Sequence, residues 1–555
     1  MNIWKKLSLG ILFLSMLVLV ACSGDNDENN EAAEDSEKQG DIVIGVDKEV
    51  VSLDPHNSND SASAQVRMNI YETLIYQNPD GELVPGLATE WEQVDENTWN
   101  FKLRQDVTFH SGQEFTAEDV KATYARVLDP NVAASVQFLF EMIDEVEVLN
   151  DHELNIKTKE PFAPLDRHLA HSTAGIMSKS LIDKDYENAL EASGLGLSLD
   201  AYYAEREEGS ESFAEYASKL NNIGQIINQE PDGTNHLKLQ SRSAGDNVVL
   251  EKFEEFNNGE RFFNTVTFKV IPENGSRVGE LETGGIDVAT GIDTASVPRI
   301  EGGADMEIIE KDSVRTTYLG LNYKKELFQD ENIKKAIAYA IDREDIVNGI
   351  FDGMGIPSKG PLAPPVWGYS EELVGAEYDI EKAKEYLSQS SQPDGFKTTL
   401  WVNEDEQIIN TAVYIQEQLK QINIDVSIEQ MEWGAYLDNL VQGNHDMFIL
   451  GWTTVTQDAD YGLYALFHSK NHGSAGNRIF YTNPKVDELL DAGRSETDEA
   501  KRADIYKEAE QLIVDDGQSV FLMHNTFFVG VNTKKATGFK LDSAGAVHIQ
   551  DVRFK

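Results

Sequence analysis

The chain has 555 residues, which suits two or three packed lobes better than one simple core. Hydrophobic residues make up 40% of it and aromatic residues 9%, so the bulk is globular. Asp and Glu number 97 against 47 Lys and Arg, and the net charge of -50 excludes nucleic acid as a partner. We interpret this charge, which is spread over the whole chain, as a solvated surface; a preference for cationic ligands is the alternative.

The first 22 residues are typical of a bacterial lipoprotein signal peptide. Lys5 and Lys6 precede an apolar stretch, residues 7–20, that is short for a membrane span. The stretch leads into Leu19-Val20-Ala21-Cys22, which resembles a lipobox, where the thiol is acylated and becomes the new N-terminus. Cys22 is the only cysteine, so the mature chain has no disulfide and no catalytic thiol.

Residues 23–40 are polar, acidic and poor in apolar side chains, which predicts a disordered tether between the lipid and the folded body. No later segment has the length and hydropathy of a membrane span. We therefore expect a lipid-anchored protein on the outer face of the cell membrane, which contacts that membrane only through its anchor.

Hydrophobic periodicity and turn residues predict alternating strands and helices, which indicates an α/β chain. Strands are predicted at 41–46, on both sides of a turn at 95–97, in a hairpin over 146–157, and at 248–256, 263–271, 316–322, 398–402, 424–428, 447–452 and 520–523. Helices are predicted from Thr116, a cap residue, and at 276–281, 332–350, 378–388, 407–422 and 499–515. Residues 184–230 are acidic, with helical tendency over 201–220, and we interpret them as an insertion.

Signatures of catalysis and of cofactor binding are missing from the sequence. It contains no G-x-x-x-x-G-K-[ST] phosphate loop, no G-x-S-x-G nucleophile elbow and no H-E-x-x-H zinc motif. The pairs His168/His171 and His468/His472 have metal-ligand spacing but no third ligand, so we expect neither a metal nor a cofactor. Binding without chemistry is the prediction, and an exported hydrolase is the alternative.

Residues 99–130 carry the most informative motif of the chain. It combines Phe109-His110-x-Gly112, the run 115–120 (FTAEDV) and Arg126. This pattern resembles the signature of the peptide/nickel/opine class of extracellular solute-binding proteins, also called family 5. Further matching segments are 52–55 (SLDP), 85–88 (PGLA), 340–343 (AIDR) and 451–452 (GW). The resemblance covers nearly all of residues 41–555 and is greatest to oligopeptide-binding members from Gram-positive bacteria.

The resemblance implies an α/β, three-lobed, periplasmic-binding-protein-like fold (type II, cluster C) with hinge closure between lobes one and three. Lobe one would combine residues 41–62, 174–318 and 525–555. Lobe two would span 63–173 and lobe three 319–524. The ligand would lie between lobes one and three, in a concave site that closes around it.

A receptor for many peptides must recognise the main chain, which all peptides share, and adding the peptide as an extra strand achieves this. By resemblance, the edges would come from residues 50–53 and 451–455, with aromatic side chains lining hydrated pockets. The implied ligand-binding residues are Val50, Val51, Ser52, Tyr318, Trp433, Gly451, Trp452, Thr453 and Asp458.

One departure from the family pattern concerns the ends of the peptide. Relatives that bind the N-terminal ammonium carry an Asp three residues after the tryptophan of the Gly-Trp pair, where this chain has Val455. Positions that hold Arg in some relatives carry Leu440 and Ile449. We therefore predict tolerance for longer peptides, with Asp458 as the candidate for an amine contact.

The functional hypothesis is the substrate-binding component of an ABC importer, which would deliver oligopeptides to permease subunits with their ATPases and would be a monomer. Two alternatives stay open. One is a receptor of the same class for an oligosaccharide, glutathione or a metal chelate; the other is a peptide-sensing surface lipoprotein.

Overall fold

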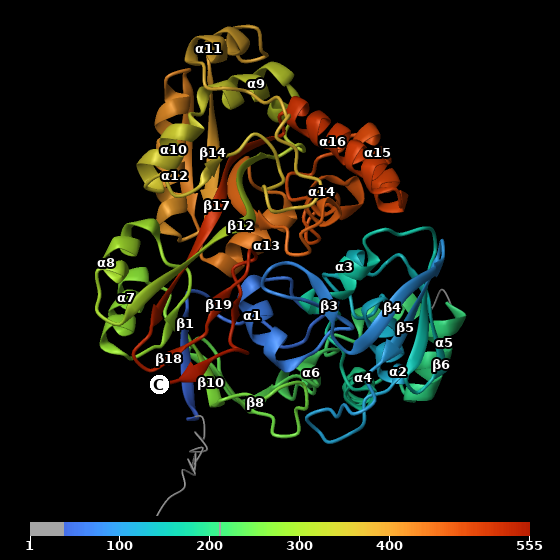
Figure 1. The fold of residues 1–555 in the computed structure, drawn as a ribbon. Coiled ribbons are helices and arrows are strands. Elements are labelled where there is room, and N and C mark those ends of the chain that lie inside the picture. The colour runs from blue at the N-terminus through green and yellow to red at the C-terminus, as the bar shows by residue number, and fades with distance from the viewer. Residues whose placement is uncertain (1–37, 210–212) are drawn as a thin grey trace, which may run out of the picture. The chain divides into compact units, whose positions relative to one another are not determined.

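The computed structural model describes residues 38–209 and 213–555, which form a mixed α/β fold (Figure 1). The predicted signal peptide, the acylated Cys22 and the tether up to residue 37 lie outside the described residues. The first strand, β1 (Gly40–Val46), begins one residue before its predicted start. Within the described part of the chain, no helix combines the length and the apolar character that crossing a membrane requires.

A sheet of 11 strands runs through most of the molecule and mixes parallel with antiparallel pairs. In spatial order its strands are β15 (Ile424–Gln430), β14 (Phe396–Val402), β16 (Met447–Thr453), β12 (Met306–Leu321), β17 (Ser519–Asn532), β11 (Val288–Ala289), β1, β10 (Phe263–Val270), β9 (Asn247–Lys252) and β8 (Leu237–Ser243), with β13 (Ile356–Pro357) paired to β17.

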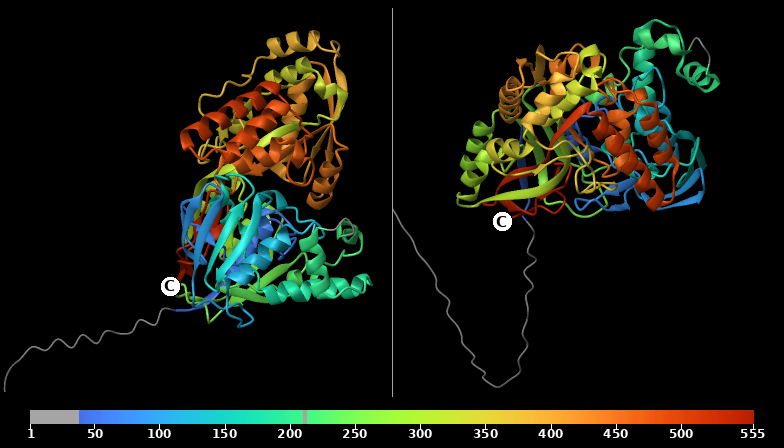
Figure 2. Two further views of the ribbon diagram at one scale, coloured as in Figure 1. Left: turned by 90° about the vertical axis from the view of Figure 1, so that its right-hand side faces the viewer. Right: turned by 90° about the horizontal axis from the view of Figure 1, so that it is seen from above.

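Two long strands, β12 and β17, connect the two ends of this sheet. They pair antiparallel, and both extend well beyond the predicted strands at 316–322 and 520–523. Residues 306–313 (MEIIEKDS) lack a regular alternation of apolar and polar side chains, so periodicity underestimates β12. Figure 1 shows β12 and β17 running side by side from the upper to the lower part of the molecule. In the left view of Figure 2, most of the yellow, orange and red chain stands above the blue and green chain.

A smaller antiparallel sheet has the order β4 (Ala88–Asp95), β5 (Thr98–Leu103), β7 (Glu153–Thr158), β6 (Ile143–Asn150). Both of its predicted hairpins are confirmed, with turns at 96–97 and 151–152. Helix α2 (Ala117–Val127) starts as predicted after Thr116, whose N–H donates to the Asp119 carboxylate at 2.8 Å. A separate two-stranded ladder joins β2 (Ile75–Gln77) and β3 (Leu83–Pro85).

The helix predicted at 332–350 is wrong as a single element. The structure has α9 (Glu331–Ala340) and α10 (Arg343–Ile350), because Asp342 caps the second helix by accepting from the Asp345 N–H at 3.1 Å. The helical tendency over 201–220 is also interrupted. Helix α5 (Leu199–Glu208) ends at Gly209, which has the positive φ of a left-handed cap.

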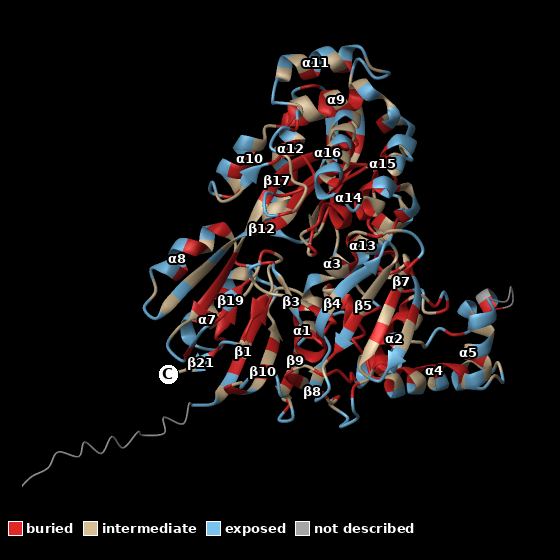
Figure 3. Ribbon diagram, turned by 45° about the vertical axis from the view of Figure 1, so that its right-hand side comes forward, coloured by how far each residue is buried: buried red, intermediate tan, exposed pale blue. Residues whose placement is uncertain are grey.

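Helices cover both faces of the upper part of the large sheet, and Figure 3 shows buried strands beneath helices whose outer sides are exposed. Helices α9 to α12 pack on the face that carries Leu319 and Ile449, and α13 to α16 pack on the face that carries Tyr318 and Leu450. The remaining helices are α1 (Ser61–Ile70), α3 (Leu165–Leu169), α4 (Lys179–Ser193), α6 (Gln225–Gln229), α7 (Asn274–Thr283), α8 (Val297–Glu301), α11 (Ile380–Ser388), α12 (Glu406–Lys420), α13 (Trp433–Gln442), α14 (Ala459–Phe467), α15 (Pro484–Ser495) and α16 (Glu499–Asp516).

A buried ion pair ties the segment after β1 to α2. The Arg126 guanidinium donates to Asp54 at 2.6 and 3.1 Å, and the two side chains are 1% and 2% exposed. Burial alone would raise the pKa of the Asp54 carboxyl, but Arg126 outweighs that effect and holds the pKa below its usual value. Two separate pieces of the sequence signature, 52–55 and Arg126, therefore meet in one structural contact.

We expect Arg126→Met to destabilise the fold by about 3–5 kcal/mol, because it leaves the Asp54 carboxylate buried without its partner. Urea unfolding followed by circular dichroism measures the change. The matched control is Lys102→Met, which breaks the exposed Lys102–Glu90 pair at 2.7 Å and should leave the unfolding midpoint nearly unchanged. Equal effects of the two variants would contradict this account of Arg126.

Candidate ligand-binding cleft

The end of β16 has one edge without a strand partner among the described residues. β16 pairs with β12 along its whole length, but with β14 only through Met447 and Phe448. The Thr454 N–H donates to the Val314 carbonyl at 2.9 Å, on the β12 side. Main-chain groups alternate between the two sides of an antiparallel strand, so those of Thr453 and Gly451 point to the open edge.

A hydrogen bond from Tyr436 supports the conclusion that the main-chain groups of Gly451 and Thr453 face away from β12. Its hydroxyl donates to the Ile449 carbonyl at 2.7 Å, on the edge that faces away from β12. The Thr453 carbonyl accepts from the Val455 N–H at 2.9 Å. The N–H and carbonyl of Gly451 and the N–H of Thr453 are therefore the groups that the open edge offers to an added strand.

Residues 50–53 do not form the predicted second strand edge, because side chains from elsewhere in the chain already make hydrogen bonds with their N–H and carbonyl groups. The Ser63 hydroxyl accepts from the N–H groups of Val51 and Ser52 at 3.0 and 3.1 Å, and the Asn228 side chain accepts from that of Leu53 at 2.7 Å. Arg242 donates to the carbonyls of Val50 and Val51. The segment is not a strand, and the N–H groups of Val51, Ser52 and Leu53 are already occupied.

The exposure of these three predicted residues differs along the segment. Val50 and Ser52 are buried, whereas the Val51 side chain is 54% exposed. Lys48, just before them, places its ammonium 4.9 Å from the ring centre of Trp433, in the first turn of α13. This contact brings the segment after β1 next to the upper part of the large sheet.

Aromatic side chains line the same region. Trp452 faces Thr316 across the β12–β16 ladder, packs on Tyr461 with ring centres 5.2 Å apart, and has a buried indole N–H without a hydrogen bond. Tyr318, on the same face of the sheet, is buried against Phe448. The structure thus brings Tyr318, Trp433 and Trp452 into one apolar cluster.

The opposite face of the open edge carries a cation. Arg315 lies over Gly451, since a Cβ at position 451 would be 2.3 Å from the guanidinium carbon, and it donates to the Thr453 hydroxyl at 3.4 Å. A glycine is needed at position 451 to leave room for this guanidinium.

Asp458 is the predicted site residue whose surroundings fit a ligand contact least. Its carboxylate caps α14 by accepting from the Asp460 N–H at 2.9 Å, and accepts twice from Arg502 at 2.6 and 2.8 Å. The side chain is buried. A contact with a peptide amine stays a prediction, and it would have to compete with Arg502 for the same oxygens.

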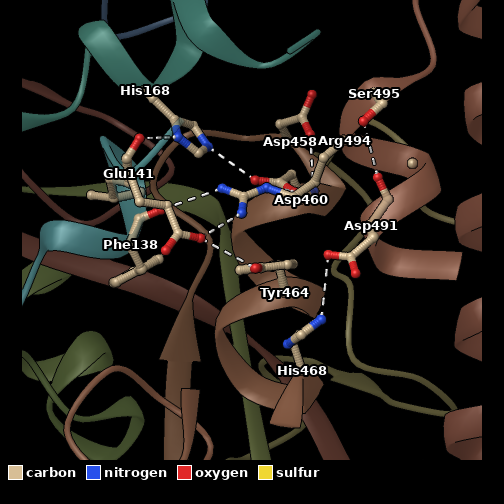
Figure 4. A network of polar contacts seen from close by, with 12 residues as sticks. Phe138, Glu141, His168, Asp458, Asp460, Tyr464, His468, Asp491, Arg494 and Ser495 are labelled. Atoms are coloured by element: carbon tan, nitrogen blue, oxygen red, sulfur yellow. Dashed lines mark hydrogen bonds and ion pairs between the residues drawn. The ribbon is translucent and has the colours of Figure 1, made fainter. Parts of the chain in front are cut away.

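A network of charges holds α14 in place (Figure 4). The Arg494 guanidinium lies 3.1 Å from both Asp460 and Glu141, and His168 Nε2 lies 3.1 Å from Asp460. Burial alone would raise the pKa of the Asp460 carboxyl, but Arg494 and His168 together lower it to about 2. His168 and Glu141 belong to the part of the chain around the small sheet, so this network spans two parts of the fold.

The histidine pairs singled out in the sequence make polar contacts within the fold. His171 Nδ1 accepts from the Thr173 N–H at 3.1 Å, and His468 Nδ1 accepts from the Lys470 N–H at 3.1 Å. Within the described ranges, no group of three or more His, Cys, Asp or Glu side chains is arranged to hold a metal ion.

Several residues of the cleft carry no signal in the sequence. Tyr461 accepts from the Asn59 amide at 2.8 Å and also packs on His171, so it lies where three parts of the chain meet. Lys48 and Arg315 belong to no motif in the sequence. Only the strand register and the tertiary contacts bring these residues to the cleft.

Comparisons with known proteins place the chain in one group. A profile described as bacterial extracellular solute-binding proteins, family 5 Middle, matches residues 82–474. The glutathione-binding protein GsiB of Pectobacterium atrosepticum is 28% identical over 509 residues, which cover 90% of this chain and 91% of that protein. The oligopeptide-binding protein AppA of Bacillus subtilis is 27% identical over 537 residues, or 93% and 92% of the two chains.

Two solved structures extend this likeness to the fold. The periplasmic binding protein DppA of Helicobacter pylori, in complex with the peptide STSA, superposes with a TM-score of 0.80 at 27% identity and covers 93% of this chain and 98% of its own. AppA of Bacillus subtilis, in complex with a nonapeptide, gives 0.79 at 25% identity, covering 94% and 100%.

We expect Arg494→Met to destabilise the protein by about 3–5 kcal/mol, because it leaves Asp460 charged and buried. Adding Asp460→Asn should restore part of that loss, since the amide carries no charge, and a double-mutant cycle by urea unfolding measures the coupling. The pKa of Asp460 is depressed, so the pair stabilises the fold above about pH 4, and this contribution is lost as the pH falls towards 2. Additive effects of the two substitutions at pH 7 would contradict the proposed coupling.

Proposed function

Because the chain belongs to the bacterial extracellular solute-binding proteins of family 5, we propose that it binds oligopeptides in the cleft beside β16 and delivers them to the permease of an ABC importer. The profile match confirms the predicted family. The solved structures confirm the predicted α/β fold, and these relatives are binding proteins rather than enzymes, as expected. The finer assignment to oligopeptides is our inference from the cleft.

The observation that carries the proposal is the open edge of β16. The main-chain groups of Gly451 and Thr453 form half of an antiparallel or parallel ladder, and an extended peptide is the ligand that completes it. Such hydrogen bonds do not depend on peptide side chains. A receptor of this kind accepts many sequences, which suits nutrient uptake.

The predicted side-chain contacts fit around this edge. Trp452 and Tyr318 would face the ligand from one side of the sheet, and Val51, the exposed member of its segment, from across the cleft. Water would fill the pockets around peptide side chains and make different sequences tolerable.

The three lobes would move as units during capture. We place lobe one at 41–62, 174–318 and 525–555, lobe two at 63–173 and lobe three at 319–524. In support, hydrophobic clusters centre on β1 and β10, on the small sheet, and on the two faces of β14 and β16. Val66 and Ile70 of α1 join the first cluster, and Tyr461 and Ala465 of α14 join the second. β12 and β17 would be the hinge, since only they among the long strands run between lobes one and three.

The protein would work on the outer face of the cell membrane as a monomer. Acylation of Cys22 would anchor it, and residues 23–37 would serve as the tether. The anchor would keep the receptor close to its permease and ATPase subunits and so raise their encounter rate.

A second candidate ligand is glutathione, because relatives at up to 28% identity are named as glutathione-binding proteins. Glutathione is itself a tripeptide with two carboxylates. It would leave much of the open edge of β16 unused.

Isothermal calorimetry tests the assignment to peptides. We expect the purified chain to bind peptides of several lengths and unrelated sequences, with weaker or no heat from glutathione, an oligosaccharide or a nickel–histidine chelate. Binding of glutathione alone, or of the sugar alone, would overturn the oligopeptide proposal while leaving family membership intact.

A scan of backbone N-methylation tests the strand-addition geometry. In a paired strand, alternate N–H groups face the partner, so methylation at every second position of a bound peptide should weaken affinity by about 2- to 10-fold or more. The positions between them serve as controls and should tolerate the methyl group. A uniform effect along the peptide would show that the main chain is not read as a strand.

A further inference from the structure

Arg478 is a cation for which the described residues supply no partner. Its side chain is partly buried, its Nε is fully buried, and no hydrogen bond or ion pair from another described residue reaches the guanidinium. A desolvated charge without a partner is costly, so proteins keep such groups mainly where a ligand or ion completes them.

Other buried arginines of the chain show how unusual this is. Arg126, Arg494 and Arg502 each lie within 3.1 Å of a carboxylate. Arg277 instead donates to four main-chain carbonyls. Arg67, which is 1% exposed, leaves its Nε and Nη2 without partners but donates through Nη1 to the Ser58 hydroxyl at 3.0 Å. Among the described residues, none accepts a hydrogen bond from the Arg478 guanidinium.

The main chain around Arg478 is held firmly, so its position is a built feature. The preceding residue, Asn477, is buried and donates to the carbonyls of His468 and Tyr481 at 3.1 and 3.0 Å, while its own oxygen accepts from the Tyr481 N–H at 2.9 Å. A flexible loop could turn an unpaired guanidinium out to water. Here the anchored main chain restricts that movement.

The neighbours of Arg478 place it beside the open edge of β16. The next residue, Ile479, is buried in the apolar cluster that also contains Tyr318, Tyr436 and Trp452. In agreement with this placement, the charge of Arg478 opposes the rise that burial imposes on the pKa of Tyr318, Tyr436 and Tyr461. The hydroxyl of Tyr436 donates to Ile449 on that edge, and that of Tyr461 accepts from Asn59 across the cleft. No carboxylate of the described chain acts on the charge of Arg478.

We propose that Arg478 binds a carboxylate of the ligand at the Ile449 end of the open edge. The inference rests on the proposed peptide-binding function and names the ligand chemistry that one subsite selects. A planar guanidinium pairs with a carboxylate through two parallel hydrogen bonds. In a cleft closed to water, this pairing removes the cost of the isolated cation.

This subsite is positively charged, whereas the protein as a whole is strongly negative. The net charge of -50 repels anions at long range, but salt screens that field within about 10 Å. Near the cleft, Arg315 lies close enough to Tyr318 to oppose the same rise in its pKa, and so adds a second positive charge.

A peptide can supply the carboxylate in two ways, from its C-terminus or from an Asp or Glu side chain. Calorimetry with one peptide in four forms separates them: free acid or C-terminal amide, each with Glu or Gln at one position. We expect the form that presents the carboxylate to bind the unaltered protein about 10- to 100-fold more tightly than its neutral counterpart.

Arg478→Met should abolish that preference and leave the affinity for the fully neutral peptide within about threefold. Arg478→Lys should keep part of it, because an ammonium retains the charge without the fork of two donors. The matched control is Lys324→Met, which removes a positive charge from the ring of nearby Phe480 and should leave the preference unchanged. A preference that survives Arg478→Met would overturn the inference.

The stability of the ligand-free protein gives a second readout. If the partner of Arg478 is a bound ligand, Arg478→Met removes a partly buried charge that has no partner in the ligand-free protein. The substitution should then raise the midpoint of thermal unfolding. If Arg478 has a structural role, the midpoint should fall, which would also overturn the inference. Failure of all peptides to bind the unaltered protein would instead contradict the proposed function.

Discussion

The antiparallel pairing of β12 with β17 is the constraint on which the rest of this structure depends. The two strands run between the parts of the large sheet, and their register shifts between Asp312 and Thr316 and again between Thr317 and Tyr318. These irregularities lie where the chain passes from one part to the other. Bulges increase the local twist of a strand. Arg315 and Tyr318 are three residues apart, so normal alternation places them on opposite faces of β12, which pairs with β16 without a shift over 315–321.

Several buried charges in the frame have ion-pair partners, whereas several polar groups near the end of β16 have no partner among the described residues. This difference explains how a rigid fold can keep a binding site available. In the frame, ion pairs such as Asp54–Arg126 and Asp460–Arg494 join buried charges. At the cleft, the main chain of Gly451, the indole N–H of Trp452 and the guanidinium of Arg478 lack partners among the described residues. Partners for such groups are what a bound peptide can supply, since it carries hydrogen-bond donors, acceptors and carboxylates.

Much of the frame could be predicted from the sequence, because local signals agree with it. The Thr116 cap, the turns of the small sheet and the strand at 447–452 lie where their residues indicate. The placement of Gly451 and Trp452 beside Tyr318 followed from a family resemblance rather than from periodicity. A resemblance can transfer a position that no local pattern specifies.

Other features could not be predicted, because they depend on contacts between distant residues. Asp458 pairs with Arg502, 44 residues away, and the segment 50–53 is held by Asn228 and Arg242, 175 and 192 residues from the groups that they contact. Arg478 resembles any surface charge in the sequence. Only the structure shows that its Nε is buried without a partner and that the next residue, Ile479, packs in the cluster of Tyr318 and Tyr436.

The central claim is that this cleft holds peptides, and the most direct test is mass spectrometry of the ligand released when the natively purified chain is denatured. Binding through the main chain predicts a mixture of short peptides with unrelated sequences and a limited range of lengths. A carboxylate subsite at Arg478 further predicts that acidic residues, or a fixed distance to the C-terminus, recur among them. Recovery of a single sugar, metal chelate or other non-peptide metabolite would contradict the account.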